Sequence, residues 1–505
     1  MTELKRMHPA TIFISAVLAL KEFLLPIIIS LFIGTTTDPI GFFRFEYIWI
    51  FLLVVAILSG LLRWVFFKYR VSEGQLYIQH GVFIRKKRFI YQHKVQSIDI
   101  TAGLFQRLFG LVKLKVETAG GGSEPEVSLL AIQKEEAINI RQYLKESFRD
   151  ETNNNITTTS EEIIDNKSMI NDEPEVKEYA ALEEQPEFQW HLTNSRLWIS
   201  ALTSSGIGLT LSAVLVLLGQ VEQFLPEAIY DRVFSFFRDS GLWLLLFFLF
   251  AGFLLAWLIS IGAHMLKYGS FKIEKYGNEL VISRGIIEKR QLTIALNRVT
   301  AVSIEKSILR QPIGFATVYV ECAGGGSMDE QLSTVILPII RPKEIQAIFA
   351  EVLPHYETNH TLISIPKRAI FRAMRRMSWL PIVVTAITCY FTSYGYWGIL
   401  IILLSLILGY LQYRDGATSM NGDFICFRFR RLKQTTVISE KKKIQSMESH
   451  TSFFQKRKRL ASIQFSVLSS ITGRTYTVVD QDDENVQRIL EWYSKESSEK
   501  DVRLS

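Results

Sequence analysis

Clusters of basic side chains are the residues of this sequence with the clearest capacity for chemistry. A Lys or Arg beside an anionic lipid surface contributes on the order of 1 kcal/mol of attraction, so a cluster can orient a tethered segment at a membrane. The alternative interpretation is that these charges only set the topology of neighbouring membrane spans or form a solvated face. The candidate membrane-surface or partner contacts are Arg85, Lys86, Lys87, Arg88, Arg372, Arg375, Arg376, Lys441, Lys442, Lys443, Lys456, Arg457, Lys458 and Arg459.

Catalytic patterns are not recognisable in the sequence. The Gly-rich runs 119–123 and 323–327 lie between predicted strands and lack the Gly-x-x-x-x-Gly-Lys-Ser/Thr order of a phosphate loop, so they indicate hairpin turns. His355 and His360 lack the Glu of a metalloprotease motif, and the 3 cysteines are too far apart for a zinc or disulfide pattern. The sequence therefore predicts no enzyme and no catalytic, cofactor-binding or metal-binding residue.

Composition indicates a membrane protein. Only 21% of the 505 residues are charged and 48% are hydrophobic, whereas soluble domains are roughly 25% charged. The net charge of +7 gathers at the edges of apolar segments and in the last third of the chain. The sequence shows no aromatic-basic RNA signature and no recognition helix. A bilayer with an anionic inner leaflet therefore explains the charge better than nucleic acid does.

An internal threefold repeat organises the chain. Gly81 aligns with Gly285 at an offset of 204, and the two Gly-rich runs align at the same offset. A third, diverged copy aligns residues 94–97 with 443–446 at an offset of 349. In each copy an apolar stretch precedes a polar segment rich in β-branched residues. The repeat predicts three related modules, each behind a membrane hairpin.

The apolar stretches predict six membrane spans in three hairpins. About 20 apolar residues are needed to cross a hydrocarbon core of about 30 Å. The last pair is short, so a single re-entrant loop is its alternative. In the first span, Lys21 and Glu22 are expected near the headgroups as a snorkelling pair; the alternative is an intramembrane functional pair. The predicted spans are 12–33, 48–67, 197–218, 241–266, 379–394 and 396–411.

Charge asymmetry predicts that the modules and both termini are cytoplasmic. Arg63, Lys267 and Arg414 flank spans on the module side, whereas the loop 219–240 on the other side has four acidic residues against two basic ones. The N-terminus has no small-residue cleavage site after an uninterrupted apolar core, so we expect no cleaved signal peptide. The basic run 367–376 has apolar residues at helical spacing and predicts an amphipathic helix in the membrane interface.

Each module is predicted to be a small β domain closed by one helix. Alternating and β-branched runs predict the strands, and amphipathic periodicity predicts the helices. Such a module forms a partly open β-barrel or a curved sandwich with the helix at one end. In the first module the predicted strands are 76–78, 88–90, 95–100, 112–118 and 127–132; the terminal helices of the three modules are 134–145, 342–352 and 484–495.

The segment between the first module and the rest is predicted to be a flexible acidic linker, because it has too few large apolar residues to fold alone. The predicted organisation is an interfacial helix and hairpin 1 (1–67), module 1 (68–148), the linker (149–187), hairpin 2 (188–266), module 2 (267–353), a basic interfacial helix with hairpin 3 (354–412) and module 3 (413–496).

Three motifs in the first two modules resemble the bacterial pleckstrin-homology-like domain of the second class. The third copy has a Lys-Arg-Lys-Arg run at 456–459 where the first has Arg-Leu-Phe-Gly at 107–110. The resemblance covers nearly the whole chain except the linker. The arrangement of hairpins and modules is similar to that of multi-repeat membrane members of the family. The motifs are Gln-His-Lys-Val-Gln-Ser at 92–97, Leu-Phe-Gln-Arg-Leu-Phe-Gly-Leu at 104–111 and Thr-Ala-Gly-Gly at 118–121, with counterparts at 297–302, 308–314 and 321–324.

The resemblance implies a β-barrel-like fold capped by a helix, acting as an interaction or membrane-association module. It also implies a single-module sister membrane protein as a partner, and a role in protection against membrane-active peptides or bacteriocins. We therefore expect a non-enzymatic membrane scaffold whose modules bind each other or a partner membrane protein. A transporter or export component, or a membrane enzyme acting on lipid, are the alternatives.

Overall fold

The computed structural model describes most of the chain. Several predicted features lie outside the described residues: Lys21 and Glu22, both Gly-rich runs, the loop 219–240 and most of the linker 149–187. The described residues are 4–18, 45–72, 75–81, 84–92, 95–118, 127–154, 185–204, 212, 241–322, 334–357, 361–392, 395–469 and 473–501.

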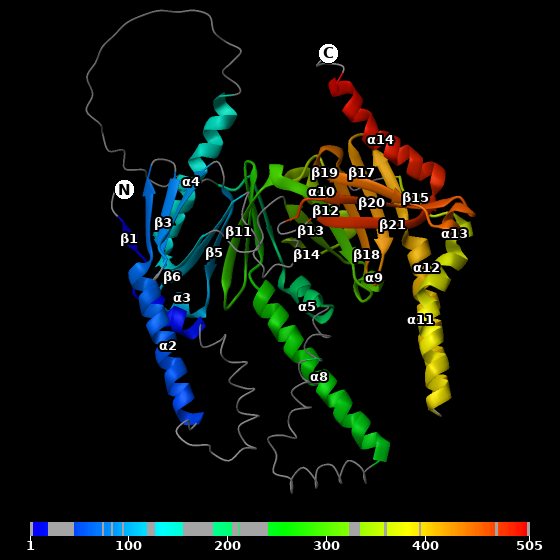
Figure 1. Ribbon diagram of the computed structural model, residues 1–505, viewed down its shortest axis with the longest axis horizontal. Coiled ribbons are helices and arrows are strands. Elements are labelled where there is room, and N and C mark those ends of the chain that lie inside the picture. Colours follow the sequence, from blue (N-terminus) through cyan, green and yellow to red (C-terminus); the bar gives the residue numbers. More distant parts are fainter. Residues whose placement is uncertain are drawn as a thin grey trace, which may run out of the picture. The chain divides into compact units, whose positions relative to one another are not determined.

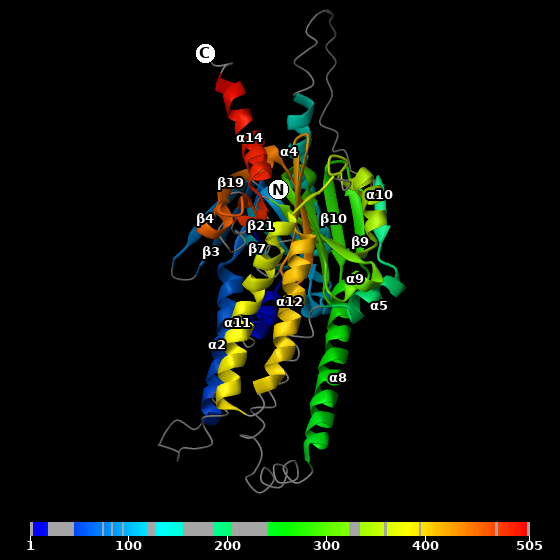
Figure 2. The same cartoon turned by 90° about the vertical axis from the view of Figure 1, so that its right-hand side faces the viewer.

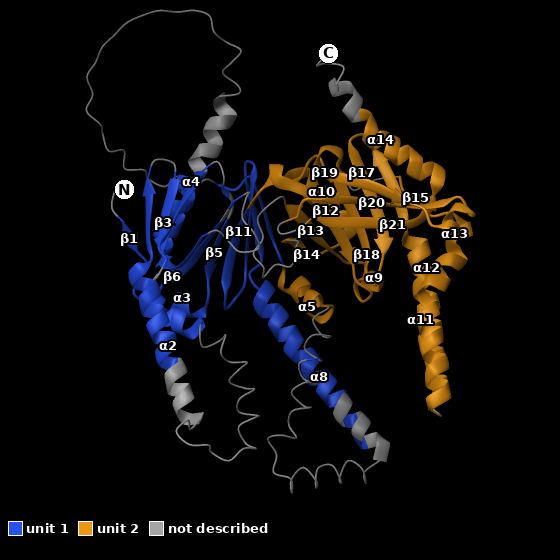
Figure 3. Ribbon diagram, viewed as in Figure 1, with its two compact units in different colours: residues 1–192, 206–293 blue, residues 193–205, 294–505 orange. Residues whose placement is uncertain are grey.

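The chain forms two compact units, which Figure 3 shows in different colours. Unit 1 comprises Met1–Leu192 and Gly206–Thr293, and unit 2 comprises Thr193–Ser205 and Ile294–Ser505. Repeat 1 lies in unit 1 and repeat 3 in unit 2. Repeat 2 contributes its first strands to unit 1 and its remaining strands to unit 2.

The β-branched and alternating runs of repeat 1 form strands where the sequence predicts them. The terminal helix starts at the predicted residue and continues into the predicted linker. The elements are β1 (Lys5–Arg6), β2 (Lys68–Ser72), β3 (Gln75–His80), β4 (Lys86–Tyr91), β5 (Val95–Ala102), α3 (Leu104–Leu108), β6 (Leu111–Thr118), β7 (Val127–Gln133) and α4 (Lys134–Asn154).

Repeats 2 and 3 follow the same order of strands and helices. In repeat 2 the elements are β8 (Phe188–His191), β9 (Lys272–Tyr276), β10 (Glu279–Arg284), β11 (Lys289–Ala295), β12 (Val299–Lys306), α9 (Arg310–Ile313), β13 (Ala316–Cys322), β14 (Thr334–Ile340) and α10 (Pro342–Val352). In repeat 3 they are β15 (Ile363–Ser364), β16 (Ala417–Asn421), β17 (Phe424–Arg430), β18 (Gln434–Glu440), η7 (Lys441–Lys443), β19 (Ile444–His450), α13 (Phe453–Lys456), β20 (Leu460–Val467), β21 (Arg474–Asp482) and α14 (Asp483–Asp501).

The aligned glycines of the repeat mark a left-handed turn. Gly81 follows β3 with φ of +108°, and Gly285 follows β10 with φ of +100°. A side chain at Gly285 would place its Cβ only 1.9 Å from the carbonyl oxygen of Glu288. Only glycine adopts this backbone without strain, so the spacing of the glycines follows from the turn geometry.

Neighbouring repeats are joined edge to edge. In unit 1, β5 of repeat 1 pairs antiparallel with β11 of repeat 2, and the resulting seven-stranded sheet has the order β7-β6-β5-β11-β10-β9-β8 (Figure 1). In unit 2, β12 of repeat 2 pairs antiparallel with β18 of repeat 3, in the order β14-β13-β12-β18-β17-β16-β15. We name these junctions seam 1 and seam 2. Their register is the same: Ile98 lies opposite Thr293, and the aligned Val302 lies opposite Ile438.

A closed barrel, which the resemblance implied, is not formed by the described strands. They make four open sheets, two of seven strands, one of four and one of three. In repeat 1 the core lies between the sheet of β1–β4 and the strands β5–β7, and α4 covers it with Ala137, Ile140 and Leu144. The edge strands of seams 1 and 2 satisfy their backbone groups with the neighbouring repeat instead of closing on their own module.

Long apolar helices precede the modules. Two described helices are long and apolar enough to cross a membrane, Phe250–Tyr268 and Gly395–Asp415, and Leu53–Phe66 is a shorter apolar helix. In unit 1, α2 and α8 extend from the sheets in the same direction (Figures 1 and 2). The helices are α2 (Phe45–Phe66), α8 (Gly241–Tyr268), α11 (Ile370–Phe391) and α12 (Gly398–Asp415).

Helices α11 and α12 pack closely as a hairpin because small residues line their interface. A Cβ at Gly398 would lie 2.4 Å from Thr385 Oγ1, and one at Gly409 would lie 2.7 Å from the Cα of Met374. Glycines that bring helix backbones together are typical of helix pairs in membranes. Two packed helices therefore stand where the sequence predicts the last pair of spans.

Two predicted segments form helices with other bounds. The described part of the predicted span 197–218 includes the end of α5 (Asn194–Leu202), and residues 205–211 and 213–218 lie outside the described residues. The basic run 367–376 is helical, and its place in the membrane interface stays a prediction. A 3-10 turn over Lys367–Ala369 leads directly into α11, which runs on through Pro381.

Candidate functional site

The structure separates the predicted basic residues into three places. Arg85, Lys86, Lys87 and Arg88 lie at or on β4 with exposed side chains. The run Lys441–Lys443 forms the 3-10 turn η7 between β18 and β19. The remaining residues of α11 and of the α13 tip come together in unit 2.

The lysines of η7 contact their own unit. The ammonium of Lys441 lies 5.0 Å from the ring centroid of Trp492 on α14. Lys442 is ion-paired with Glu440 at 2.6 Å, and Lys443 Nζ donates to the carbonyl oxygen of Asn297 at 2.6 Å. These contacts give the cluster a role in joining the elements of unit 2.

A buried carboxylate binds two of the three predicted arginines of α11. Asp480 on β21 is 1% exposed. Arg372 Nε donates to its Oδ1 at 2.6 Å, and Arg376 Nη1 donates to its Oδ2 at 2.8 Å. The side chain of Gln455 donates to Oδ1 at 2.9 Å. Asp480 thereby ties the hairpin of α11 and α12 to module 3, and it has φ of +62°, which non-glycine residues seldom adopt.

The tip of module 3 combines basic and aromatic side chains beside α11. Phe453 and Phe454 are 78% and 62% exposed, and the residues 456–459 that follow them are exposed. The guanidinium of Arg375 lies 5.9 Å from the ring centroid of Phe454. Exposed aromatic rings with adjacent cations are typical of segments that lie at lipid headgroups.

Repeat 2 uses a different polar joint at the aligned position. Arg310 on α9, aligned with Gln455, is 6% exposed. Its guanidinium donates to Thr203 Oγ1 at 3.0 Å, Ser200 Oγ at 3.1 Å and the carbonyl oxygen of Pro338 at 2.8 Å. This joint lies at the end of α5 and ties that helix to α9 of module 2.

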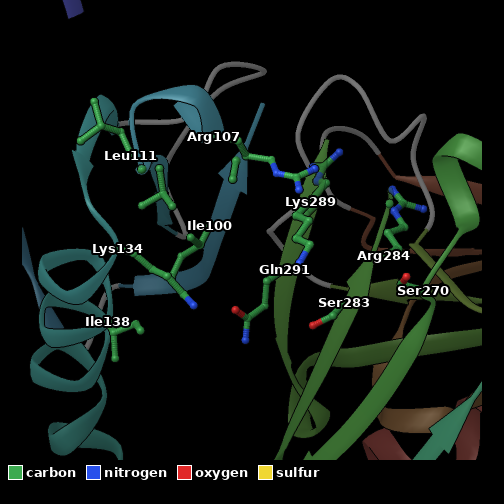
Figure 4. Close-up of a pocket in the computed structure, with 15 residues that line it drawn as sticks. Ile100, Arg107, Leu111, Lys134, Ile138, Ser270, Ser283, Arg284, Lys289 and Gln291 are labelled. Atoms are coloured by element: carbon green, nitrogen blue, oxygen red, sulfur yellow. The ribbon is translucent and has the colours of Figure 1, made fainter. Parts of the chain in front are cut away.

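A basic cavity at seam 1 was not predicted from the sequence. It has a volume of about 460 Å³, and Figure 4 shows side chains from α4 and β5 on one side facing β10 and β11 on the other. The described residues that line it include five basic side chains and no acidic one. The basic ones are Arg107, Lys134, Arg284, Lys289 and Arg290.

Three of these cations are held by their surroundings. Arg290 forms an ion pair with the buried Asp99 at 2.9 Å. Arg107 donates to the carbonyl oxygens of Ile286 and Ile287 at 2.6 and 2.9 Å. Burial lowers the pKa of the Arg284 guanidinium, whose charge lies 5.4 Å from the ring centroid of Tyr268 at the end of α8.

The remaining two cations give the cavity its capacity to hold an anion. Among the described residues, no ion pair connects Lys134 or Lys289 to a carboxylate. Ser270 and Ser283 add hydroxyl groups to the lining. A phosphate or carboxylate group fits this chemistry, because charged donors such as these two lysines form strong hydrogen bonds to an anion. The sequence gives no signal for this site, because the five cations come from four elements, α3, α4, β10 and β11, that are far apart in the chain.

Comparison with known proteins agrees with the motifs and the repeat. The family model described as "Bacterial PH domain" matches residues 15–148, 214–354 and 378–497. The chain belongs to the bacterial PH domain family. A relative of this family, the UPF0699 transmembrane protein YdbT of Bacillus subtilis (strain 168), is 32% identical over 507 residues, covering 99% of this chain and 100% of the relative. The three matched bacterial PH domains correspond to the three repeats, including the diverged third copy.

Proposed function

We propose that this chain is a non-enzymatic, multi-pass membrane scaffold whose cytoplasmic bacterial PH domains hold one another in a fixed order. The observation that carries the proposal is the pair of seams, in which β5 pairs with β11 and β12 pairs with β18. Continuous sheets across repeats make each domain part of a shared framework. The polar networks of Asp480 and Arg310 join helices to the modules.

The membrane topology is part of the same proposal. Six spans in three hairpins keep every module on one side, and a basic residue stands in the last turn of the helix that enters each module: Arg63, Lys267 and Arg414. By the positive-inside rule that side is the cytoplasm. The relative is a transmembrane protein by its name, and two described helices meet the length and hydropathy that a span requires.

The anionic inner leaflet is the proposed lipid partner. The cavity at seam 1 takes the phosphate of an anionic phospholipid headgroup, since its lining includes Ser270, two residues beyond the end of α8. The exposed tip of module 3 contacts the same leaflet. For a module already tethered to the bilayer, these contacts set orientation more than recruitment.

Envelope protection against membrane-active peptides is the proposed biological outcome, with a single-module sister membrane protein as a further partner. The test is growth of a deletion strain on a panel of membrane-active cationic peptides. We expect hypersensitivity that the intact gene rescues. The single variants Asp99→Arg and Arg290→Asp break the ion pair at seam 1 and fail to rescue, whereas the double variant restores it. Unchanged growth across the panel would contradict the protective role.

A further inference from the structure

All four sheets of the described residues are open at their ends, and two of these edges are complementary. The four-stranded sheet has the order β1-β2-β3-β4, so β4 of repeat 1 forms an edge. The three-stranded sheet has the order β19-β20-β21, so β19 of repeat 3 forms another edge (Figure 2). An open edge presents a row of backbone N–H and C=O groups that can pair with another chain.

The two edge strands correspond to the two strands that pair in a seam. By the repeat alignment, β4 is the counterpart of β11 and β18, and β19 is the counterpart of β5 and β12. In both seams a strand of the first kind pairs with a strand of the second kind, in the same register. The chain therefore carries one unmatched half at each end of its series of repeats.

Exposure of side chains separates these edges from their counterparts. Phe89 on β4 is 51% exposed, whereas the aligned Thr293 and Ile438 are 7% and 1% exposed. In β12 the residues 299–305 are all buried, whereas in β19 only Ile444 is buried. A large apolar side chain at an open edge is exposed to water, and pairing with another strand would bury it and lower the free energy.

We propose that two copies of this chain associate head to tail, with β4 of one copy adding to β19 of the next in the register of the seams. This inference deepens the proposed scaffold function by naming a second copy as a partner. A second copy is the occupant that fits, because each chain carries both complementary edges and builds the same junction twice internally. Head-to-tail contacts of this kind form rings or filaments.

The seam register specifies the contacts between the two copies. The counterpart of the pair Ile98 and Thr293 is Met447 opposite Phe89, which buries an apolar pair. One position along, Glu448 lies opposite Arg88. Charges of opposite sign that face each other across strands stabilise the pairing.

The ion pair of seam 1 also has a counterpart in this register. Asp99 aligns with Glu448 and Arg290 with Lys86, and the seam 1 pair is 2.9 Å apart. Glu448 is exposed, and only its Oε2 accepts the hydrogen bond from Gln464 of its own sheet, at 2.9 Å. The alternative is that the basic residues of β4 only protect the edge from pairing.

The test uses disulfide formation between two differently tagged full-length copies in membranes, one with Phe89→Cys and the other with Met447→Cys. Both copies carry Cys389→Ala, because Cys389 is the exposed native cysteine. Burial raises the pKa of the Cys322 and Cys426 thiols to about 12, so these remain unreactive. We expect mild oxidation to link the two tags in a heterodimer.

Two controls make the result decisive. His450→Cys, three residues out of register with Phe89, is expected to link at least about fivefold less, because each residue moves the partner by about 3.4 Å. Ile98→Cys with Thr293→Cys, opposite each other in seam 1, is expected to link within one chain.

The outcomes separate the two proposals. If the disulfide of seam 1 forms but no heterodimer does, head-to-tail association is overturned and the proposed scaffold function stands. If the disulfide of seam 1 does not form, the proposed scaffold function is contradicted. Equal linking at His450 and Met447 overturns the register. Finally, Glu448→Lys should lower the Phe89–Met447 link about fivefold, and Arg88→Glu in the other copy should restore it; no change on Glu448→Lys would overturn the pairing.

Discussion

Seams 1 and 2 have the same backbone pairing but different contents. Seam 2 is closed: the residues 299–305 of β12 are buried, and a carboxylate with no exposed surface, Glu321, links repeat 2 to repeat 3. Seam 1 leaves a cavity of about 460 Å³ lined by five cations. The comparison teaches that strand pairing sets which repeats adjoin, while side chains decide whether the junction is a core or a site.

The network of Glu321 explains why seam 2 is closed. Its carboxylate accepts hydrogen bonds from Ser469 at 2.9 Å and from Tyr476 at 3.0 Å, and it is ion-paired with Arg474. Tyr476 also shares a hydrogen bond with Ser303 on β12 at 3.3 Å. A buried charge is tolerated only when it is paired and hydrogen-bonded, and these partners come from the third repeat.

Removal of Glu321 should cause the largest loss of stability among the variants of the two seams. Glu321→Ala leaves Arg474 without its carboxylate and opens a gap in seam 2. Breaking a buried ion pair costs about 3–5 kcal/mol, which corresponds to a fall in apparent Tm of roughly 10 °C. Thermal unfolding of the purified protein in detergent would measure it. Glu491→Ala, at an exposed position of α14, is the control; an equal shift in both variants would contradict the assignment.

Removal of Asp99 should destabilise seam 1 by less. Asp99→Ala removes the ion pair with Arg290, but Arg290 lines the cavity, where water can replace the lost carboxylate. We expect a loss of about 2 kcal/mol and a fall in apparent Tm of about 5 °C. The same unfolding experiment checks the order of the two variants. A larger effect for Asp99→Ala than for Glu321→Ala would reverse the comparison.

A pH profile should separate the seams further. Burial raises the pKa of the Glu321 carboxyl above its ordinary 4.5, against the opposing effects of Arg474, Ser469 and Tyr476. The folded chain then holds this proton more tightly than the unfolded chain does, so its contribution to stability falls as pH rises from 4.5 through the raised value. Glu321→Gln should flatten that part of the curve of Tm against pH. A profile unchanged by the substitution would contradict the raised pKa.

Neutralising the cavity should leave stability unchanged and reduce lipid binding. The double variant Lys134→Ala and Lys289→Ala removes two cations from seam 1. Added anionic phospholipid should stabilise the wild type, and about tenfold more lipid should be needed for the variant. Lys343→Ala, at an exposed position of α10 in unit 2, is the matched control. Equal lipid dependence in all three proteins would exclude the cavity as a headgroup site.

Two of the predicted membrane-surface or partner contacts also bind a buried acid of their own chain. Arg372 and Arg376 are adjacent to apolar positions in the sequence and were predicted to face a membrane surface or a partner. In the structure both bind Asp480, which follows them by more than 100 residues. The residues 456–459 are exposed, and their contact with a membrane surface or a partner stays a prediction.

The sequence by itself determined the threefold repeat with its aligned glycines, the strands of the first module and the helix α10, whose predicted bounds agree with Pro342–Val352. These features depend on side-chain periodicity and local backbone conformation, which neighbouring residues specify. Only the tertiary structure decided the seams, the partners of Glu321 and Asp480, and the cavity. Strand pairing uses backbone N–H and C=O groups that every repeat offers alike, so the choice of neighbour depends on how distant segments pack.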